Sequence, residues 1–308
     1  MIYIEATEST IDKKVKAVCA PLFATNQFLL GGHSDDTSNA TVTFVQFKSR
    51  IYAVTCHHVL SAFQSEALKT GRRIVPSIHS GRSIHQFHSY GLEGQYRWTF
   101  HSCRDFPSDA NINDEDALDE LKRQSAERPD IAIADLTETW SEIQRLRGAE
   151  AINLDNWEEP NWSVCQQVWL AYGFPDGHKY LANEKVAAPM PRVAVELASS
   201  HPTPDKPTYT LCSTLALEHG WGFSGISGGP VLVAHNTDDR FAYVGITFEG
   251  APSAADIQQN EEAFIGKCDI VLMGYHLTPS QFEDWLTKLA FGVEFSARTG
   301  RPVARSDV

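Results

Sequence analysis

Three side chains in this sequence are of the types that together attack a carbonyl group. Ser227 lies in a glycine-rich segment, His58 follows an apolar run, and Asp130 opens another apolar run. A serine hydroxyl becomes a nucleophile when a histidine takes its proton and a carboxylate orients that histidine. The residue types therefore indicate acyl transfer, provided that the fold brings them together.

The serine segment, residues 222–230, reads GFSGISGGP. Its glycines permit a tight backbone that residues with a Cβ rarely adopt. Such a loop exposes the serine hydroxyl and aims backbone N–H groups at the oxygen on which negative charge develops. Taken alone, the motif is also compatible with a glycine-rich hairpin turn.

The histidine and aspartate segments each offer a choice. Residues 52–60 read YAVTCHHVL, in which His57 and His58 both follow the end of an expected strand. Asp130 precedes the run at 131–134, and Asp135 follows it. We favour Asp130, because a carboxylate at the mouth of an apolar strand accepts a hydrogen bond from the histidine while shielded from water.

These segments resemble the motifs of trypsin-like serine peptidases, in a style nearest to bacterial, HtrA-like members. Alignment on Thr55 selects His58 as the general base, and DIAI at 130–133 is similar to the family's aspartate segment. The order His58, Asp130, Ser227 is that of the chymotrypsin-type triad. The resemblance implies a serine endopeptidase that forms an acyl-enzyme, with an oxyanion hole at the N–H groups of Gly225 and Ser227.

Short β-rich runs separated by turn residues dominate the chain, which favours an all-β fold. The resemblance makes this two Greek-key β-barrels. We also expect a partly helical insertion, with a surface helix at 113–127. A C-terminal helix is expected as well, capped by Thr278. The expected strands are 15–23, 41–47, 51–55, 131–134, 167–172, 192–197, 208–212, 231–234, 242–248 and 270–273.

We expect two domains and a tail. The N-terminal barrel, 1–150, carries His58 and Asp130, and an insertion around 61–129 explains the long separation between them. The C-terminal barrel, 151–296, carries Ser227 and the final helix. Residues 297–308 are polar, and we expect a flexible tail.

Composition and charge indicate the cellular compartment and limit the classes of binding partner. The 308 residues carry a net charge of −13, which disfavours nucleic acid. No apolar run is long enough for a membrane helix, and the N-terminus lacks a secretory pattern, so we expect a cytoplasmic protein. The 6 cysteines are scattered without metal-like spacing. We therefore expect free thiols and neither a metal nor a cofactor.

The resemblance also implies substrate-binding residues. The segment 244–250 is similar to the strand along which a peptide substrate lies, so Phe248, Glu249 and Gly250 should border the cleft. Trp221 falls where the base of the specificity pocket lies. A bulky indole there would favour small or aliphatic residues, whereas Glu249 would attract a basic one, and both alternatives stay open.

One departure from the family concerns activation. Ile226 stands where digestive members carry an aspartate that pairs with a newly cleaved N-terminus. Activation by N-terminal cleavage is therefore not expected. Our hypothesis is that the Gly225–Ile226 peptide completes the oxyanion hole when an activating partner or ligand binds, before a protein or peptide substrate is cleaved.

Two other functions remain open on sequence alone. The chain is also compatible with a catalytically silent binding module of trypsin-like fold. Alternatively, GISGG at 225–229 matches the nucleophile elbow of α/β-hydrolase esterases, with Asp269 and His276 as the later acid and histidine. An elbow leads into a helix, whereas the run after Pro230 is strand-like.

Overall fold

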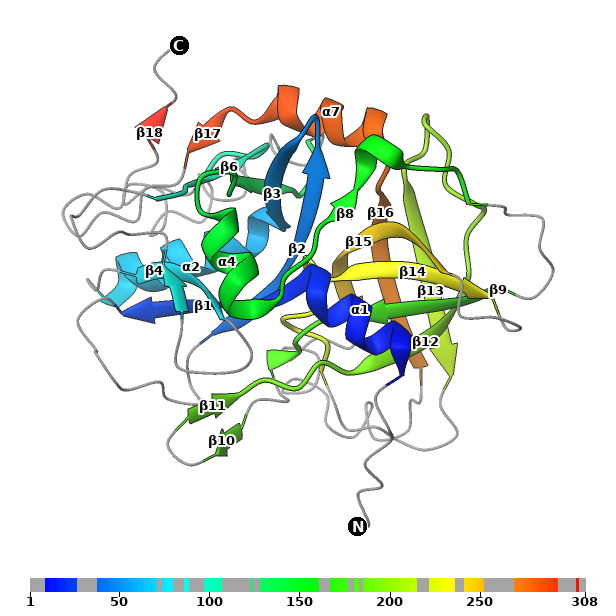
Figure 1. The fold of residues 1–308 in the computed structure, drawn as a ribbon, viewed down its shortest axis with the longest axis horizontal. Helices are drawn as coiled ribbons and strands as arrows, with labels where there is room; N and C mark the ends of the chain where they lie inside the picture. Colours follow the sequence, from blue (N-terminus) through cyan, green and yellow to red (C-terminus); the bar gives the residue numbers. More distant parts are fainter. Residues whose placement is uncertain are drawn as a thin grey trace.

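The structure is a computed structural model that describes residues 9–26, 38–70, 74–79, 86–88, 97–106, 123, 128–160, 167–176, 180–182, 185–214, 222–235, 241–251, 269–292 and 303–304. Two β units lie side by side, an open sheet and a closed barrel (Figure 1). The expected all-β fold with a C-terminal helix is confirmed. Within these residues, no helix combines the length and apolar character needed to cross a membrane.

Six antiparallel strands close the barrel of the second half in the order β12-β13-β16-β15-β14-β9. Burial alternates along β12, where Val193 and Val195 point inward, as the period of two in this segment predicts. The barrel strands are β9 (Gln167–Tyr172), β12 (Arg192–Leu197), β13 (Thr208–Thr214), β14 (Pro230–His235), β15 (Phe241–Ala251) and β16 (Asp269–His276).

A 10-stranded sheet forms the first unit, in the order β18-β17-β6-β7-β3-β2-β1-β4-β5, with β8 paired to β2. This path has two free ends, so the described strands form a half-barrel in place of the expected closed one. The strands are β1 (Cys19–Asn26), β2 (Asn39–Phe47), β3 (Arg50–Thr55), β4 (Ile74–His79), β5 (Gln86–His88), β6 (Phe100–Ser102), β7 (Ala132–Asp135), β8 (Ile152–Asn153), β17 (Phe291–Gly292) and β18 (Val303–Ala304).

Smaller elements surround the two units. A separate hairpin joins β10 (Tyr180–Ala182) to β11 (Lys185–Ala187). The helices are α1 (Thr10–Val18), α2 (His57–Thr70), α4 (Trp140–Arg147), the 3-10 turn η1 (Leu154–Asn156) and α7 (Pro279–Lys288). The expected helix at 113–127 lies outside the described residues apart from Arg123, and so does the tail apart from β18. The domain boundary at residue 150 stays a prediction.

Two local expectations were wrong. Residues 15–18 end α1 and do not form a strand, because Ser9 and Asp12 form a capping box and the buried Val15 and Val18 share one helix face. Helix α2 was not expected, since the sequence predicts an insertion around 61–129 whose one named helix is at 113–127. In contrast, α7 begins as predicted, where the Thr278 hydroxyl accepts from the Gln281 N–H at 3.1 Å.

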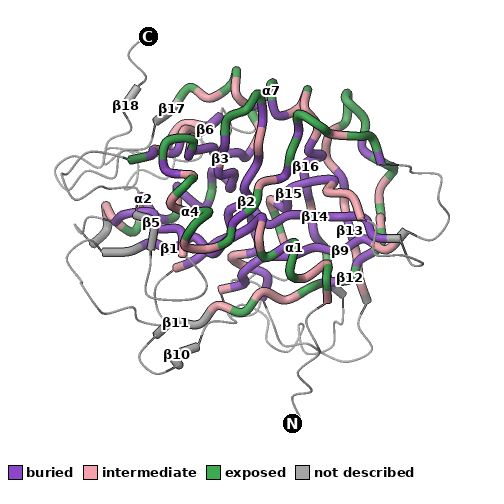
Figure 2. The backbone as a smooth tube through the Cα atoms, in the orientation of Figure 1, coloured by how far each residue is buried: buried purple, intermediate pink, exposed green. Residues whose placement is uncertain are grey.

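Buried residues occur along the strands of both units (Figure 2), and their apolar side chains form several clusters. One cluster joins Val45 and Val54 of the sheet to Ile246 and Tyr275 of the barrel. Trp285 of α7 belongs to the same cluster and is fully buried. The C-terminal helix therefore packs against both units. This shared core fixes the position of the sheet relative to the barrel.

Candidate active site

His58 lies in the first turn of α2, directly after strand β3. Strands β3 and β7 are antiparallel, and Thr55 pairs with Ala132. The chain that leaves β3 and the chain that enters β7 therefore meet at one edge of the sheet. At this edge His58 Nδ1 lies 2.7 Å from Asp130 Oδ2, and the His58 backbone N–H donates to Asp130 Oδ1 at 3.0 Å.

The Asp130 carboxylate is held as an anion in a buried place. Its residue is only 7% exposed. Burial by itself raises the pKa of this carboxyl, but the hydrogen bond from the His58 ring, the charge of His58 and the nearby Arg104 guanidinium together hold the pKa below its ordinary value. An anionic Asp130 accepts the Nδ1–H of His58, which leaves Nε2 free to accept a proton.

Ser227 comes from the opposite unit, on the loop that leads into β14. Gly225 and Gly228 have φ of 94° and 89°, a backbone region that favours glycine. A Cβ on Gly228 would lie 2.0 Å from the Thr41 carbonyl oxygen, so the loop approaches β2 more closely than a side chain allows. Thr41 N–H donates to the Ser227 carbonyl at 3.1 Å across this contact.

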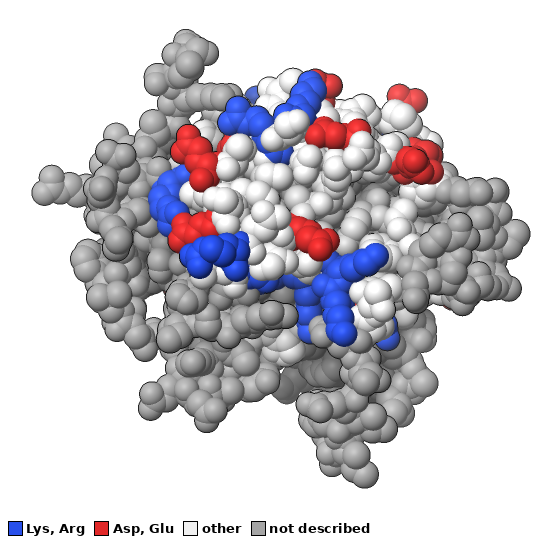
Figure 3. Space-filling model, viewed as in Figure 1, with Lys and Arg blue, Asp and Glu red and all other residues white. Residues whose placement is uncertain are grey.

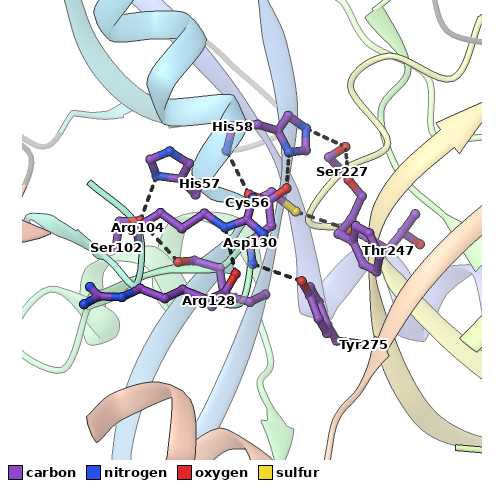
Figure 4. A network of polar contacts seen from close by, with 12 residues as sticks. Cys56, His57, His58, Ser102, Arg104, Arg128, Asp130, Ser227, Thr247 and Tyr275 are labelled. Carbon is purple, nitrogen blue, oxygen red and sulfur yellow. Dashed lines mark hydrogen bonds and ion pairs between the residues drawn. The ribbon is translucent and has the colours of Figure 1, made fainter. Parts of the chain in front are cut away.

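The Ser227 hydroxyl and the His58 ring face each other (Figure 4), with Oγ 3.1 Å from Nε2. The same hydroxyl lies 3.1 Å from the Phe248 carbonyl oxygen, a second acceptor for its single proton. His58 thus bridges Asp130 and Ser227 through its two ring nitrogens. A proton leaving the hydroxyl has a direct route to Nε2.

The N–H groups of Gly225 and Ser227 donate to no protein acceptor in the part of the chain that the structure describes. The N–H groups between and after them are occupied, since Ile226 donates to the Phe223 carbonyl and Gly228 donates to the Thr247 carbonyl. Two free donors two residues apart, on the loop that carries the hydroxyl, are suited to binding a negatively charged oxygen. They are the donors expected from the sequence.

Sequence reasoning missed the residues that support Asp130 from behind. The Asp130 N–H donates to the Tyr275 hydroxyl at 3.0 Å, and Arg104 Nε donates to the Arg128 carbonyl at 2.8 Å beside it (Figure 4). Tyr275 is buried on β16, and only the pairing of the two units reveals its role. No pattern around residue 275 could have indicated it.

His57 is buried and is not part of the bridge. Its Nδ1 lies 2.8 Å from Ser102 Oγ, and its ring packs against Phe106. Burial lowers the pKa of His57 to about 4, so the ring is neutral near pH 7. The sequence assigned no role to this histidine, and the structure shows that it is a packed side chain of the first unit.

The rival aspartate lies elsewhere. Asp135 is at the other end of β7, where it pairs with the exposed Arg50 and accepts from the Thr137 N–H at 2.9 Å. Figure 3 shows that basic and acidic side chains occur close together on the displayed face, and Lys48 forms a similar ion pair with Glu283. Asp135 therefore belongs to a surface pair of a common kind, which contributes little to stability.

The expected substrate residues are placed only in part. Trp221 lies outside the described residues. Phe248 lies on β15, where the pairing with β16 shifts register between Thr247 and Glu249, and its ring is 4.4 Å from that of Tyr275. Glu249 is exposed, and Gly250 packs so closely that a Cβ would lie 2.8 Å from Phe223 Cβ.

The esterase alternative is wrong. The loop after Ser227 leads into strand β14, and an α/β-hydrolase elbow leads into a helix. His276 lies on β16, where its ring packs against that of Trp157, with 6.2 Å between the ring centroids. The described strands of the barrel are all antiparallel, which is a different architecture from a parallel hydrolase sheet.

Neither a protein-family model nor a curated protein matches the chain. Many solved structures are similar to it, among them two proteases. A thermostable serine protease, AL20, from an extremophilic microorganism aligns with a TM-score of 0.42 and 13% identity, over 89% of this chain and 97% of that chain. The protease Anisep from Arthrobacter nicotinovorans aligns with a TM-score of 0.41 and 11% identity, over 90% and 97%.

Both TM-scores lie below 0.5, so the function proposed below rests on the geometry of this chain's own residues. The decisive geometry is the pair of distances from one imidazole, 2.7 Å to a buried carboxylate and 3.1 Å to a hydroxyl. Three residue types from distant parts of the chain meet there in the arrangement that activates a serine.

Proposed function

We propose that the chain is a serine endopeptidase, with Ser227 as nucleophile, His58 as general base and Asp130 as the residue that orients the histidine. The observation that carries this proposal is the His58 ring, which lies within hydrogen-bonding distance of both other side chains. The buried anion on one side and the free Nε2 on the other make the imidazole a proton acceptor for the hydroxyl.

The reaction would proceed by two acyl transfers. Ser227 Oγ attacks the peptide carbonyl carbon while its proton moves to His58 Nε2, and the carbonyl oxygen takes the negative charge between the N–H groups of Gly225 and Ser227. The imidazolium then gives its proton to the leaving amine as the C–N bond breaks. A water molecule, deprotonated by His58, hydrolyses the acyl-enzyme and restores the serine.

A protein or peptide is the proposed substrate, because strand β15 runs beside the Ser227 hydroxyl. The Phe248 carbonyl oxygen of this strand lies 3.1 Å from Ser227 Oγ. A peptide strand laid along β15 would pair with backbone groups there, as in β-augmentation. We do not propose a nucleic acid partner, because the net charge of −13 opposes a phosphate backbone.

The test is covalent labelling with a fluorophosphonate, read by intact mass and peptide mapping. We expect one adduct, on Ser227, that is lost in Ser227→Ala and in His58→Ala. Ser224→Ala is the matched control, since it removes a neighbouring serine of the same loop and should still be labelled. Hydrolysis of an unfolded protein should follow the same pattern among the variants.

The second candidate is a binding module that has kept the trypsin-like fold without catalysis. It is favoured only by the missing activation aspartate, which Ile226 replaces. A folded protein that is never labelled, with or without peptide, would support this candidate and contradict the peptidase proposal.

A further inference from the structure

Strand β2 of the first unit reaches into the nucleophile loop of the second through two buried hydroxyls, of which that of Thr41 binds the Gly225 carbonyl and that of Thr43 binds a carbonyl further along the loop. Thr41 is fully buried, and its Oγ1 donates to the Gly225 carbonyl at 2.9 Å. The same oxygen accepts from the Phe174 N–H at 2.9 Å. A single side chain therefore ties the loop that carries Ser227 to the turn that follows β9.

The turn after β9, residues 173–176, makes the second attachment. The Asp176 N–H donates to the Ser224 carbonyl at 2.6 Å. The turn is itself held to β2, because Asn39 Nδ2 donates to the Phe174 carbonyl at 2.5 Å and the Asn39 N–H donates to Asp176 Oδ1 at 3.1 Å. We call Asn39, Thr41 and residues 173–176 the loop clamp.

The loop clamp fixes the direction of the Gly225 N–H. In a trans peptide, the N–H and C=O groups point in opposite directions. Because the Ser224 carbonyl points at Asp176, the Gly225 N–H of the same peptide points away from the clamp. Ile226 N–H donates to the Phe223 carbonyl at 3.1 Å, and Gly225 has φ of 94°, which together describe a type II turn.

Inverting the 224–225 peptide would convert this turn to type I and turn the Gly225 N–H inward. The inversion would break the bond to Asp176 and leave the Ser224 carbonyl without that partner. The loss of such a bond disfavours the inverted form by roughly 10–100-fold. The arrangement with the N–H directed outward is therefore the preferred one before any ligand binds.

Ile226 contributes to the same arrangement by packing. The side chain is fully buried, and a Cβ on Gly173 would lie 2.6 Å from Ile226 Cγ1. Ile226, which stands where an activation aspartate would be, thus packs against Gly173 of the loop clamp. An ion pair at this position would have no role, because backbone hydrogen bonds and this contact already hold the loop.

We propose that the loop clamp keeps the oxyanion hole formed in the free protein, with Thr41 as its central positioning residue. This inference rests on the proposed peptidase function and deepens it. It stands against the hypothesis that a partner or ligand must complete the hole by moving the Gly225–Ile226 peptide. The purified protein is then active without an activator.

The test compares Thr41→Val with Thr139→Val, both without added ligand. Thr41→Val removes both hydrogen bonds of the hydroxyl at nearly constant volume. Thr139 is the matched control, since it is also buried and its Oγ1 donates to a carbonyl, that of Leu136, at 3.2 Å. Assays measure kcat and KM on a peptide amide, and the affinity for a peptide aldehyde whose adduct places its oxygen in the hole.

We expect Thr41→Val to lower kcat and aldehyde affinity by about 10–100-fold together, with KM changed less than about threefold. Thr41→Ser keeps the hydroxyl and should restore both values to within about threefold. Thr139→Val, which removes one buried hydrogen bond, should also lower the free energy of unfolding while kcat stays unchanged. A general loss of folded protein lowers the apparent kcat but leaves both KM and the affinity for the aldehyde unchanged, so the joint fall of kcat and aldehyde affinity distinguishes the two cases.

If Thr41→Val does not fold, Asp176→Ala provides the same readout. Asp176 is half-buried, and the substitution removes the side-chain acceptor for the Asn39 N–H. We expect a smaller decrease of about 3–10-fold, again in kcat and aldehyde affinity and not in KM. Equal values in Asp176→Ala and the wild type would contradict the inference.

The outcomes separate the inference from the proposed function. Wild-type protein that is labelled at Ser227, with Thr41→Val indistinguishable from Thr139→Val, overturns the loop clamp and leaves the peptidase intact. Activity that requires an added partner or peptide also overturns the clamp and supports the switch hypothesis. Wild-type protein that is never labelled overturns both proposals.

Discussion

Replacing Asp130 by asparagine tests the orientation of the histidine most directly. Asp130 accepts from two donors of His58, the backbone N–H at 3.0 Å and Nδ1 at 2.7 Å. An asparagine has one acceptor oxygen and one NH₂ donor in the same positions. The backbone N–H is always a donor, so the amide oxygen faces it and the NH₂ faces Nδ1.

The consequence for His58 is the wrong tautomer. Facing an NH₂ donor, Nδ1 must accept, and the ring proton then sits on Nε2, where it opposes the proton of the Ser227 hydroxyl. We expect kcat to fall by about 10⁴, equivalent to about 5 kcal/mol of transition-state stabilisation, with KM nearly unchanged. Steady-state hydrolysis of a peptide amide and the rate of fluorophosphonate labelling measure this loss.

Asp135→Asn is the matched control. It makes the same chemical change at the other end of β7, where the carboxylate pairs with exposed Arg50. We expect its kcat to remain within about twofold of the wild type, because exposed ion pairs contribute little. An Asp130→Asn enzyme within about tenfold of the wild type, or an equal loss in Asp135→Asn, would refute the assignment.

Three further predictions follow from contacts around this centre and one distant turn. Tyr275→Phe leaves the buried Asp130 N–H without its acceptor, and we expect kcat to fall about 3–10-fold with KM unchanged in steady-state assays. The pKa of His57 falls to about 4 on burial, so the unfolded chain binds more protons between about pH 6.5 and 4. The free energy of unfolding should therefore decrease by up to about 3 kcal/mol as the pH falls through that window, and urea titrations should show a smaller decrease in His57→Gln. Ser49 is exposed in the turn between β2 and β3, and its φ of 61° is a strained backbone angle for a residue with a Cβ. Ser49→Gly should therefore raise the free energy of unfolding by about 0.5–1 kcal/mol in urea titrations. A decrease would contradict backbone strain at this position.

Local sequence determined much of the barrel and the loop that carries the serine. The alternation in 192–197 and the apolar runs that became β9, β14 and β16 predict strands, because side chains on a strand point to opposite faces in turn. The Thr278 cap predicts the start of α7 for an equally local reason. The glycines at 225 and 228 indicate a backbone that only glycine adopts easily, as their positive φ confirms.

Other features were beyond local patterns, because they depend on which strands pair. Helix α2 was missed, although it is the element that directs His58 toward Asp130. The choice between Asp130 and Asp135 also depends on pairing, since the two residues flank one short run and only the antiparallel alignment of β3 with β7 brings the first of them to the histidine.

Residue types and their order along the chain are enough to indicate acyl transfer and a triad. Tertiary structure decided which of them meet, and with what support. Tyr275 and Thr41 carry no recognisable motif, yet one binds the Asp130 N–H and the other holds the Gly225 carbonyl. The physical reason is that a hydrogen bond needs atoms within about 3 Å, and for residues far apart in sequence only the packing of the two β units sets that distance.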